Sequence, residues 1–119
     1  MQNSNRKTGL IGEDLALNYL LNQGYLLLER NWRFKHYEID LIMKDGSFLV
    51  FVEVKARSTA AFGWPEQAVH LSKQAFLLKA AQEYLFQNNN QGELRFDIIA
   101  IILTKSGPKI EHIKDFFIP

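Results

Sequence analysis

The first part of the chain has the hydrophobic period of an α-helix. Between residues 8 and 23, leucines recur at helical spacing and fall on or near one face: Leu10, Leu17, Leu20 and Leu21. Gly24 follows directly, and glycine is the preferred residue just past the end of a helix. Residues 1–7 are polar, and the sequence predicts a disordered tail there. We therefore expect a helix at 8–23 to open a single domain that spans residues 8–119.

The rest of the chain contains short strand-type runs and one long helical stretch. Runs rich in aliphatic and aromatic residues predict strands at 25–29, 38–43, 48–55, 94–103 and 109–113. A loop is expected from Arg57 to Pro65, and a helix from Glu66 to about Asn88. A long helix between two apolar strands is typical of a crossover that joins parallel strands. The runs 48–55 and 94–103 are apolar on both faces, so we expect these two strands to be internal in the sheet. The order α-β-β-β-α-β-β thus predicts an α/β fold, in which helices flank a mixed central sheet of about five strands.

A hairpin is expected between the second and third strands, because Asp-Gly at 45–46 is a strong two-residue turn signal. With these residues as the turn, Asp40 lies opposite Phe51, and Glu38 lies opposite Glu53. Paired residues share a face, and strand residues alternate between faces. The sequence therefore predicts that four charged residues converge on one side of the sheet: Glu38, Asp40, Glu53 and Lys55.

Glu53 and Lys55 lie in a run of Phe, Val and Leu, which is the composition of a buried strand. Charged side chains are rare there unless they are paired, hydrogen-bonded or bound to a metal. Several carboxylates in one patch repel each other, and a divalent cation would remove that repulsion. Oxygen ligands without His or Cys suit Mg²⁺ or Mn²⁺. The alternative is that Lys55 pairs with Glu53 or Asp40 on a solvent-exposed edge of the sheet.

An Asp followed by Glu-x-Lys on the next strand is the set that metal-assisted cleavage of a phosphodiester requires. The metal would hold the phosphate and lower the pKa of a water, while Lys55 would assist the water or the transition state. Glu13 and Lys73 lie on or beside the apolar stripes of the two predicted helices, where charged side chains are unusual and suggest a functional role. For each, a second interpretation stays open: Glu13 favours the helix dipole, and Lys73 extends to solvent from the edge of its stripe.

Basic and aromatic residues alternate between the first two predicted strands, where Arg30, Arg33, Lys35 and His36 surround Trp32 and Phe34. Basic side chains suit phosphates, and exposed rings could stack on unpaired bases. Arg33, Lys35, Arg57 and Lys73 are the candidate contacts to nucleic acid. The other interpretation is that the two rings belong to the core beside a solvated charged face.

Composition limits the class of protein. The chain of 119 residues has a net charge of +1, so it lacks the overall positive charge of a strongly basic nucleic-acid binder. Without cysteine it has neither a disulfide framework nor a thiolate ligand. A cytoplasmic protein is the simplest expectation, and no apolar run is long enough to span a bilayer. Arg95 and Asp97 are expected to form a structural ion pair, and His70 and His112 are isolated residues.

An ordered set of motifs resembles the YraN-like family of predicted endonucleases, over roughly residues 9–104. The set consists of Gly12-Glu13, Gly24-Tyr25, 30–33 (Arg-Asn-Trp-Arg), 38–42 (Glu-Ile-Asp-Leu-Ile), 51–57 (Phe-Val-Glu-Val-Lys-Ala-Arg), Lys73 and 95–97 (Arg-Phe-Asp). The family is classed with the restriction-endonuclease-like fold of the PD-(D/E)xK superfamily, and the chain is also similar to archaeal Holliday junction resolvases.

The resemblance implies a role for each matching residue. Asp40 takes the place of the superfamily aspartate, Glu53 and Lys55 take the Glu-x-Lys positions, and Glu13 takes the helix glutamate of resolvase-like members. Because those nucleases use Mg²⁺ or Mn²⁺ on DNA, Asp40, Glu53 and Glu13 are the implied metal ligands. The family usually has Gly before Glu-Ile-Asp, where this chain has Tyr37, whose ring could restrict access to the acidic residues.

These observations predict a metal-dependent endonuclease that acts on DNA, including branched or junction DNA, and two rivals remain. One is a nucleic-acid-binding module on the same fold with little or no turnover. The other is a protein-interaction domain in which the acidic cluster is an ion-pair network, with the apolar residues 116–118 at an interface. Cutting a junction needs two active sites, so a homodimer fits the first hypothesis.

Overall fold

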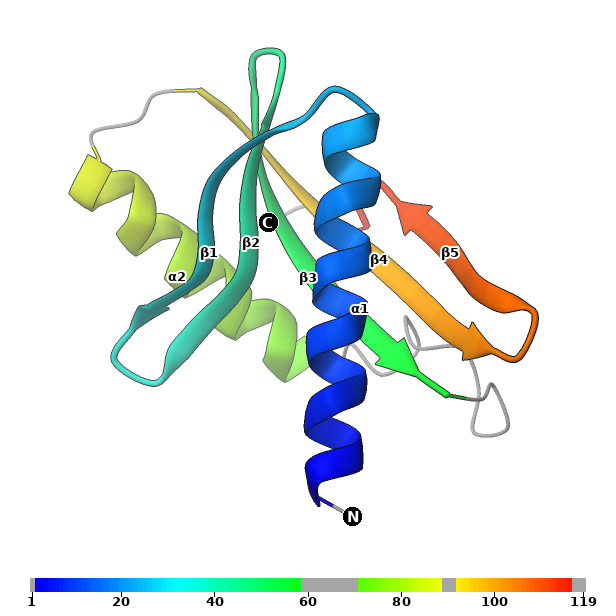
Figure 1. The fold of residues 1–119 in the computed structure, drawn as a ribbon. Helices are drawn as coiled ribbons and strands as arrows, with labels where there is room; N and C mark the ends of the chain where they lie inside the picture. The colour runs from blue at the N-terminus through cyan, green and yellow to red at the C-terminus, as the bar shows by residue number, and fades with distance from the viewer. Residues whose placement is uncertain (1, 59–70, 89–91, 117–119) are drawn as a thin grey trace.

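The protein is built on a five-stranded sheet with a helix on each face, as seen in a computed structural model that describes residues 2–58, 71–88 and 92–116 (Figure 1). Side chains are described from residue 8 in the first segment and from residue 73 in the second. The elements are α1 (Gln2–Asn22), β1 (Leu26–Phe34), β2 (Tyr37–Asp45), β3 (Phe48–Arg57), α2 (Leu71–Asn88), β4 (Glu93–Thr104) and β5 (Gly107–Ile113). This confirms the predicted α/β fold, its element order and its restriction-endonuclease-like architecture.

The strands lie in the sheet in the same order as in the chain, from β1 to β5. Only β3 and β4 are parallel among the described strands, and the other neighbours are antiparallel. A parallel pair needs a crossover connection, and α2 lies in that connection. β3 is the central strand and β4 is its neighbour, which confirms the prediction that these two apolar runs are internal.

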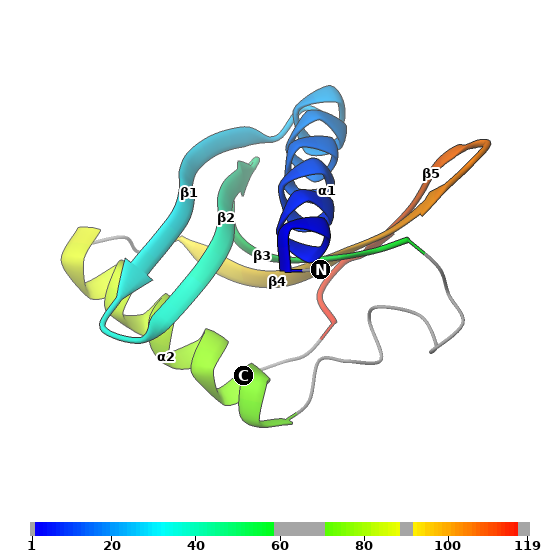
Figure 2. The same cartoon turned by 60° about the horizontal axis from the view of Figure 1, so that its bottom comes forward.

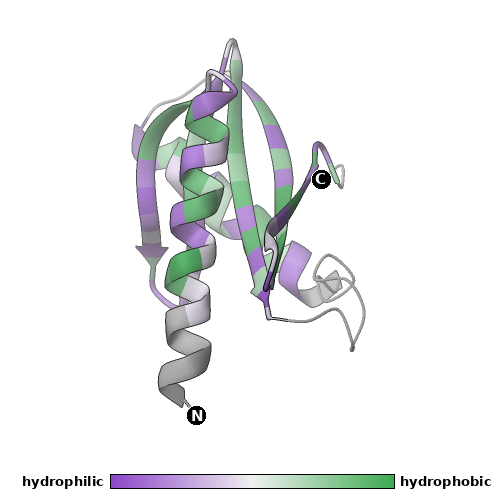
Figure 3. Cartoon of the chain, turned by 45° about the vertical axis from the view of Figure 1, so that its right-hand side comes forward, coloured by the Kyte–Doolittle hydropathy of each residue, from purple (hydrophilic) through white to green (hydrophobic). Residues whose placement is uncertain are grey.

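The two helices cover opposite faces of the sheet (Figure 2). On one face, Ala16 and Leu20 of α1 pack on a cluster that includes Val50 and Val52 of β3. On the other face, the buried side of α2 packs against Ile42, Phe51 and Phe96. With both faces covered, the inner strands are mostly hydrophobic, with hydrophilic bands between (Figure 3). Within the described residues, neither helix has the length and apolar character needed to cross a membrane.

The buried face of α1 differs from the predicted leucine stripe. Gly12, Ala16 and Leu20 are buried, whereas Leu10 and Leu21 are 55% and 43% exposed. Leu17 and Leu20 of the predicted stripe do pack on the core. Gly12 and Ala16, small residues spaced by four, take the place of Leu10 and Leu21 and allow the helix to approach β3 closely. The helix begins at Gln2 in the structure, whereas the sequence predicts a disordered tail over residues 1–7. Those residues contain neither Gly nor Pro, which would break a helix.

Gly12 sets how closely α1 can approach the sheet. A Cβ atom on this residue would overlap the Cβ of Ala56 on β3. We therefore expect Gly12→Ala to lower the free energy of unfolding by about 1–3 kcal/mol, the usual cost of overpacking. Chemical denaturation measures this change. Gly9→Ala is the matched control, since nothing lies within 4 Å of a Cβ there, and alanine should stabilise the helix by about 0.5–1 kcal/mol. Equal effects of the two variants would contradict this account.

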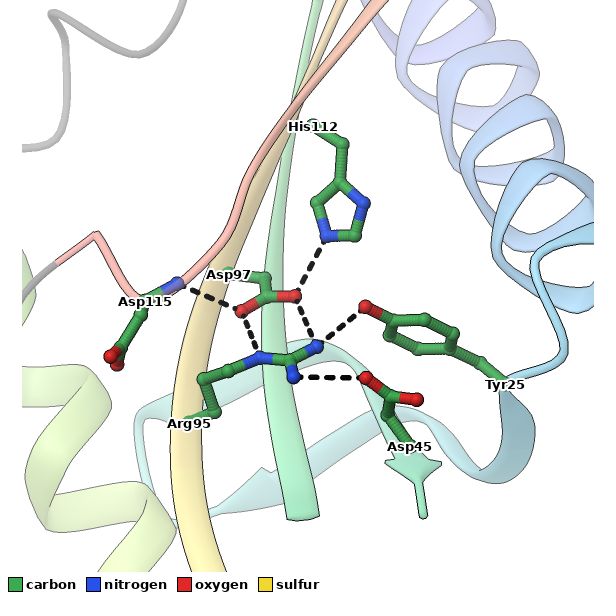
Figure 4. Close-up of polar contacts among 6 residues, drawn as sticks. All are labelled: Tyr25, Asp45, Arg95, Asp97, His112 and Asp115. Atoms are coloured by element: carbon green, nitrogen blue, oxygen red, sulfur yellow. Dashed lines mark hydrogen bonds and ion pairs between the residues drawn. The ribbon is translucent and has the colours of Figure 1, made fainter.

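A buried polar network lies where β4 begins, beside Tyr25 (Figure 4). Arg95 contacts Asp97 through two hydrogen bonds and also donates to Asp45 and the hydroxyl of Tyr25. Asp97 is fully buried and contacts His112 Nε2 at 2.7 Å. Burial alone would raise the pKa of Asp97, but hydrogen bonds from His112 and Arg95 hold it below its usual value.

This network confirms the structural ion pair between Arg95 and Asp97, and it corrects the view of His112 as an isolated residue. His112 pairs with Ile99 across β4 and β5, which brings it onto the same face as Asp97. His70 lies outside the described residues. The chain then turns so that the Asp115 N–H donates to Asp97, and Phe116 packs on the α2 side of the sheet. The other two residues of the predicted apolar C-terminal interface, 117 and 118, are not described.

Candidate active site at the fork between two strands

The candidate site lies where β2 separates from β3. The last pair that joins these strands is Leu41 with Val52. Beyond it, β2 pairs only with β1 and β3 pairs only with β4, which leaves an opening that we call the fork (Figure 1). Asp40 and Glu53 are the first residues beyond the last pair. Asp40 Oδ2 accepts a hydrogen bond of 2.8 Å from the backbone N–H of Val54, a donor that β2 no longer pairs with.

The hairpin register differs from the predicted one. Asp45 pairs with Phe48, so the two-residue turn lies one position later than expected, at Gly46 and 47. Moving the turn by one residue shifts the cross-strand pairing by two positions, and a period of two keeps each side chain on its face. The predicted pairs of Asp40 with Phe51 and of Glu38 with Glu53 are therefore wrong, and Asp40 is instead brought level with Glu53.

A depression of about 410 Å³ opens on the α1 side of the fork. Its lining residues come from α1, β1, β2 and β3: Gly9, Leu10, Glu13, Asn31, Arg33, Glu38, Asp40, Val54 and Ala56. Val54 and Ala56 of β3 line this depression. Because strand residues alternate, Glu53 and Lys55 project from the opposite side of β3. Glu53 there contacts Lys73 of α2. The predicted convergence on one side of the sheet is thus observed only in part. The alternation of β2 is interrupted at Asp40, because Ile39 packs on the α2 side of the sheet and Leu41 on the α1 side.

Three of the four acidic side chains around the fork have a cationic partner. Glu13 Oε1 accepts a hydrogen bond of 2.6 Å from Arg30, and this bond raises the pKa of the arginine. The remaining pairs are Arg33 with Glu38 at 2.6 Å, Lys55 with Glu53 at 3.4 Å, and Lys73 with Glu53 at 3.6 Å. No cation of the described residues lies within ion-pair distance of Asp40, which is the one carboxylate here without charge compensation.

This position perturbs the acidity of Asp40. Burial raises its pKa from 3.8 to about 7, and the negative charges of Glu53, Glu13 and Glu38 act in the same direction. The hydrogen bond from Val54 opposes them without cancelling them. A carboxyl group whose ionisation is opposed by burial and by nearby negative charges is one whose ionised form a cation would stabilise. Perturbed carboxyl groups at an opening in the fold are also typical of functional sites.

Lys55 does pair with Glu53, as the alternative interpretation expects, but the pair is not at a solvent-exposed edge of the sheet. Glu53 is only 4% exposed and belongs to the central strand. Lys73 reaches it from α2 while its side chain stays 39% exposed. Both interpretations of Lys73 therefore hold in part, because it lies at the edge of its helix stripe and also contacts an acidic residue of the site.

The residues of the fork fit a divalent cation with few protein ligands. Within the described part of the chain, no group of three or more His, Asp or Glu side chains is arranged to hold a metal ion. Mg²⁺ commonly uses one or two carboxylates and keeps several waters or substrate oxygens. Asp40 and Glu53 meet that requirement, and the excess negative charge on Asp40 favours it. Glu13 is held by Arg30, so it would join such a shell only if that pair opened.

The four candidate nucleic-acid contacts differ in how much of each side chain is exposed to solvent. Arg33 lines the depression and is 74% exposed, although it pairs with Glu38. Lys35 is exposed at the β1–β2 tip, where its Nζ lies 5.3 Å from the ring of Phe34. Arg57 ends β3 and is half-buried. Of the four candidates, Arg33 and Lys73 contact acidic residues of the fork.

The aromatic residues beside this basic stretch are tied to the fold. Trp32 packs edge-on against Tyr84 of α2, with ring centroids 5.3 Å apart, which confirms its assignment to the core. Phe34 stacks on Trp32. The ring of Tyr37 packs on Phe76 of α2 and does not line the depression, so it leaves that side of Asp40 open.

Sequence reasoning missed Asn31, which lines the depression from β1 with φ at 54°. This left-handed backbone is uncommon in a strand, and asparagine is one of the few residues that adopt it readily. The asparagine between Arg30 and Trp32 could have indicated this left-handed backbone from the sequence. Reasoning from residues also missed that Arg30 neutralises Glu13, which only the distance between β1 and α1 shows.

The fold and the fork define the class of this chain as an α/β protein of restriction-endonuclease-like architecture with an acidic site. The chain belongs to the uncharacterised protein family UPF0102, whose sequence model matches residues 12–101, and the resemblance to the YraN-like family is confirmed. It is 48% identical to a UPF0102 protein of Chlorobium chlorochromatii, covering 97% of this chain and 94% of that one. It is 45% identical to UPF0102 protein FP2501 of Flavobacterium psychrophilum, covering 92% of each chain.

Proposed function

We propose that this protein is a metal-dependent endonuclease that hydrolyses phosphodiester bonds of DNA. The observation that carries the proposal is Asp40, a carboxylate without a cationic partner in the described residues, whose pKa rises to about 7 beside Glu53. Stability alone does not favour such a group, because a charge held out of water without a partner is destabilising. A bound Mg²⁺ or Mn²⁺ and a substrate phosphate would supply what this site lacks.

Asp40 and Glu53 would hold the cation, with Glu13 as a further ligand if Arg30 released it. A cation bound there stabilises charge on the phosphate and favours deprotonation of the attacking water. Lys55 projects from the same side of β3 as Glu53, so its ammonium group can donate to the water or to a phosphate oxygen. The hydrogen bond from Val54 fixes the carboxylate of Asp40, which orients its free oxygen before substrate binds.

Arg33 and Arg57 would contact phosphates of the DNA, and Lys35 at the hairpin tip would add a further contact. The depression at the fork would accept a phosphodiester from the α1 side of the sheet, which suits DNA with accessible strands, including branched DNA. Cleavage of both strands at a junction needs two sites, and a homodimer would provide them. We propose that the protein acts on DNA in the cytoplasm.

The alternative is a nucleic-acid-binding module with little or no turnover, and one observation favours it. The described residues offer no cluster of three metal-ligating side chains. Such a module would bind DNA without metal and with a strong salt dependence, because phosphate contacts release counterions. It would also tolerate loss of the charge on Asp40.

The proposal is tested by titrating Mn²⁺ and Mg²⁺ into the wild type and Asp40→Ala by calorimetry, then assaying the same samples on linear and branched DNA. We expect the wild type to bind metal and to cut DNA only with metal present, and Asp40→Ala to lose both properties. Salt-sensitive DNA binding without metal binding would establish the binding module instead. Absence of both metal and DNA binding would favour a protein-interaction domain.

A further inference from the structure

Glu53 is contacted by two lysines that come from different elements. Lys55 on β3 lies 3.4 Å from Glu53 Oε1, and Lys73 on α2 lies 3.6 Å from the same oxygen. Charge-assisted hydrogen bonds between an ammonium and a carboxylate are typically about 2.7–2.9 Å long. Both lysines therefore neutralise the charge of Glu53 without being tightly bound to it.

One lysine suffices to compensate one carboxylate, and Lys55 occupies the Glu-x-Lys position. Lys73 is a second cation, and it has the more exposed side chain, at 39% against 30% for Lys55. A divalent cation bound at Glu53 would repel an ammonium group this close to it. The long side chain of Lys73 can then extend to solvent or to a phosphate, because only its stem needs to stay beside α2.

We infer that Lys73 competes with the divalent cation for Glu53 and becomes a phosphate contact once the cation displaces it. This inference rests on the proposed function, because it requires metal at Glu53 and a phosphate nearby. It implies that metal and nucleic acid bind more tightly together than separately, since metal binding releases a positive charge for the phosphate. Thermodynamic linkage makes this coupling reciprocal. A fixed phosphate contact would instead leave the affinity for metal unchanged.

The test compares the Mn²⁺ affinity of the DNA-free wild type, Lys73→Met and Lys79→Met by calorimetry. Methionine keeps an unbranched side chain without the charge. Lys79 is an exposed lysine on the same helix with no ion pair among the described residues. We expect Lys73→Met to bind Mn²⁺ about threefold more tightly than the wild type, and Lys79→Met to match the wild type.

A second measurement follows the coupling to DNA. Fluorescence anisotropy of labelled DNA is recorded with and without Ca²⁺, which also takes carboxylate oxygens. The gain in DNA affinity on adding Ca²⁺ should be several-fold smaller in Lys73→Met than in the wild type. Equal or weaker Mn²⁺ binding by Lys73→Met overturns the inference, as does absence of Mn²⁺ binding in both proteins. Mn²⁺ binding by a wild type that cuts no DNA would contradict the proposed function, while the comparison of affinities would still decide the role of Lys73.

Discussion

Asp40→Asn should make the metal-free protein more stable above neutral pH, although it removes a residue of the candidate site. The pKa of Asp40 rises from 3.8 to about 7 in the folded protein, and each tenfold change in an equilibrium corresponds to about 1.4 kcal/mol. Ionising this carboxyl group in the fold therefore costs on the order of 4 kcal/mol. Asparagine carries no charge, and its amide oxygen can still accept the hydrogen bond from Val54.

The sign of the pH dependence follows from the raised pKa. Between pH 4 and 7 the folded protein keeps a proton on Asp40 that the unfolded chain has lost, so stability falls as pH rises. The stabilising contribution of the protonated form is complete below the unfolded pKa and is lost above the folded one. We expect Asp40→Asn to exceed the wild type by about 2–4 kcal/mol at pH 8 and by less than about 1 kcal/mol at pH 4.5.

Urea denaturation at these two pH values measures the difference. Asp14→Asn is the control, because Asp14 is exposed and already paired with Arg30, and a surface substitution of this kind should change stability by about 0.5 kcal/mol or less. Millimolar Mg²⁺ at pH 8 should stabilise the wild type and leave Asp40→Asn unchanged. If the wild type gained stability over Asp40→Asn between pH 4.5 and 8, the account of Asp40 would be wrong.

Glu53→Gln and Lys55→Met should both abolish cleavage, but they should differ in metal binding. Removal of one charge-stabilising group from an active site typically costs about 10²–10³ in rate, so we expect each variant to cut DNA at least about a hundredfold more slowly than the wild type. Glu53→Gln also removes a ligand and should bind Mn²⁺ weakly. Lys55→Met keeps both carboxylates and should retain Mn²⁺ binding.

Single-turnover cleavage and calorimetry on the same preparations separate these roles. Lys79→Met is again the control, because it removes an exposed positive charge on α2 without touching the fork. Full cleavage by Lys55→Met would remove that residue from the mechanism. Equal loss of metal binding in both variants would show that Lys55 supports the architecture of the site and not the chemistry.

The sequence predicted the fold well where local pattern and tertiary structure agree. The apolar runs of β3 and β4 belong to strands that are covered on both faces, so their composition alone identified them as internal. The predicted face of α1 was right for Leu17 and Leu20 and wrong for Leu10 and Leu21, because the close approach of Gly12 and Ala16 to β3 also sets which side of the helix is buried. β1 ends at Phe34, five residues beyond the predicted end at 29, since pairing with β2 extends it through residues 30–34.

The candidate site was predictable to the level of which residues matter, but not how they are arranged. Period two placed Glu53 and Lys55 together, and they do lie within 4 Å of each other. The fork was not predictable, because the point at which β2 leaves β3 depends on the twist of the whole sheet. For the same reason, sequence could not show that Glu13 and Glu38 have arginine partners while Asp40 has none in the described structure.

The central claim is that Asp40 and Glu53 support metal-dependent cleavage of DNA. The most direct test is single-turnover cleavage of labelled branched and linear DNA by the wild type and by the Asp40→Ala, Glu53→Ala double variant, each with Mn²⁺ and with a chelator. The account predicts products only with the wild type and Mn²⁺. Unchanged cleavage by the double variant, or a wild type that cuts neither DNA with Mn²⁺, would contradict it.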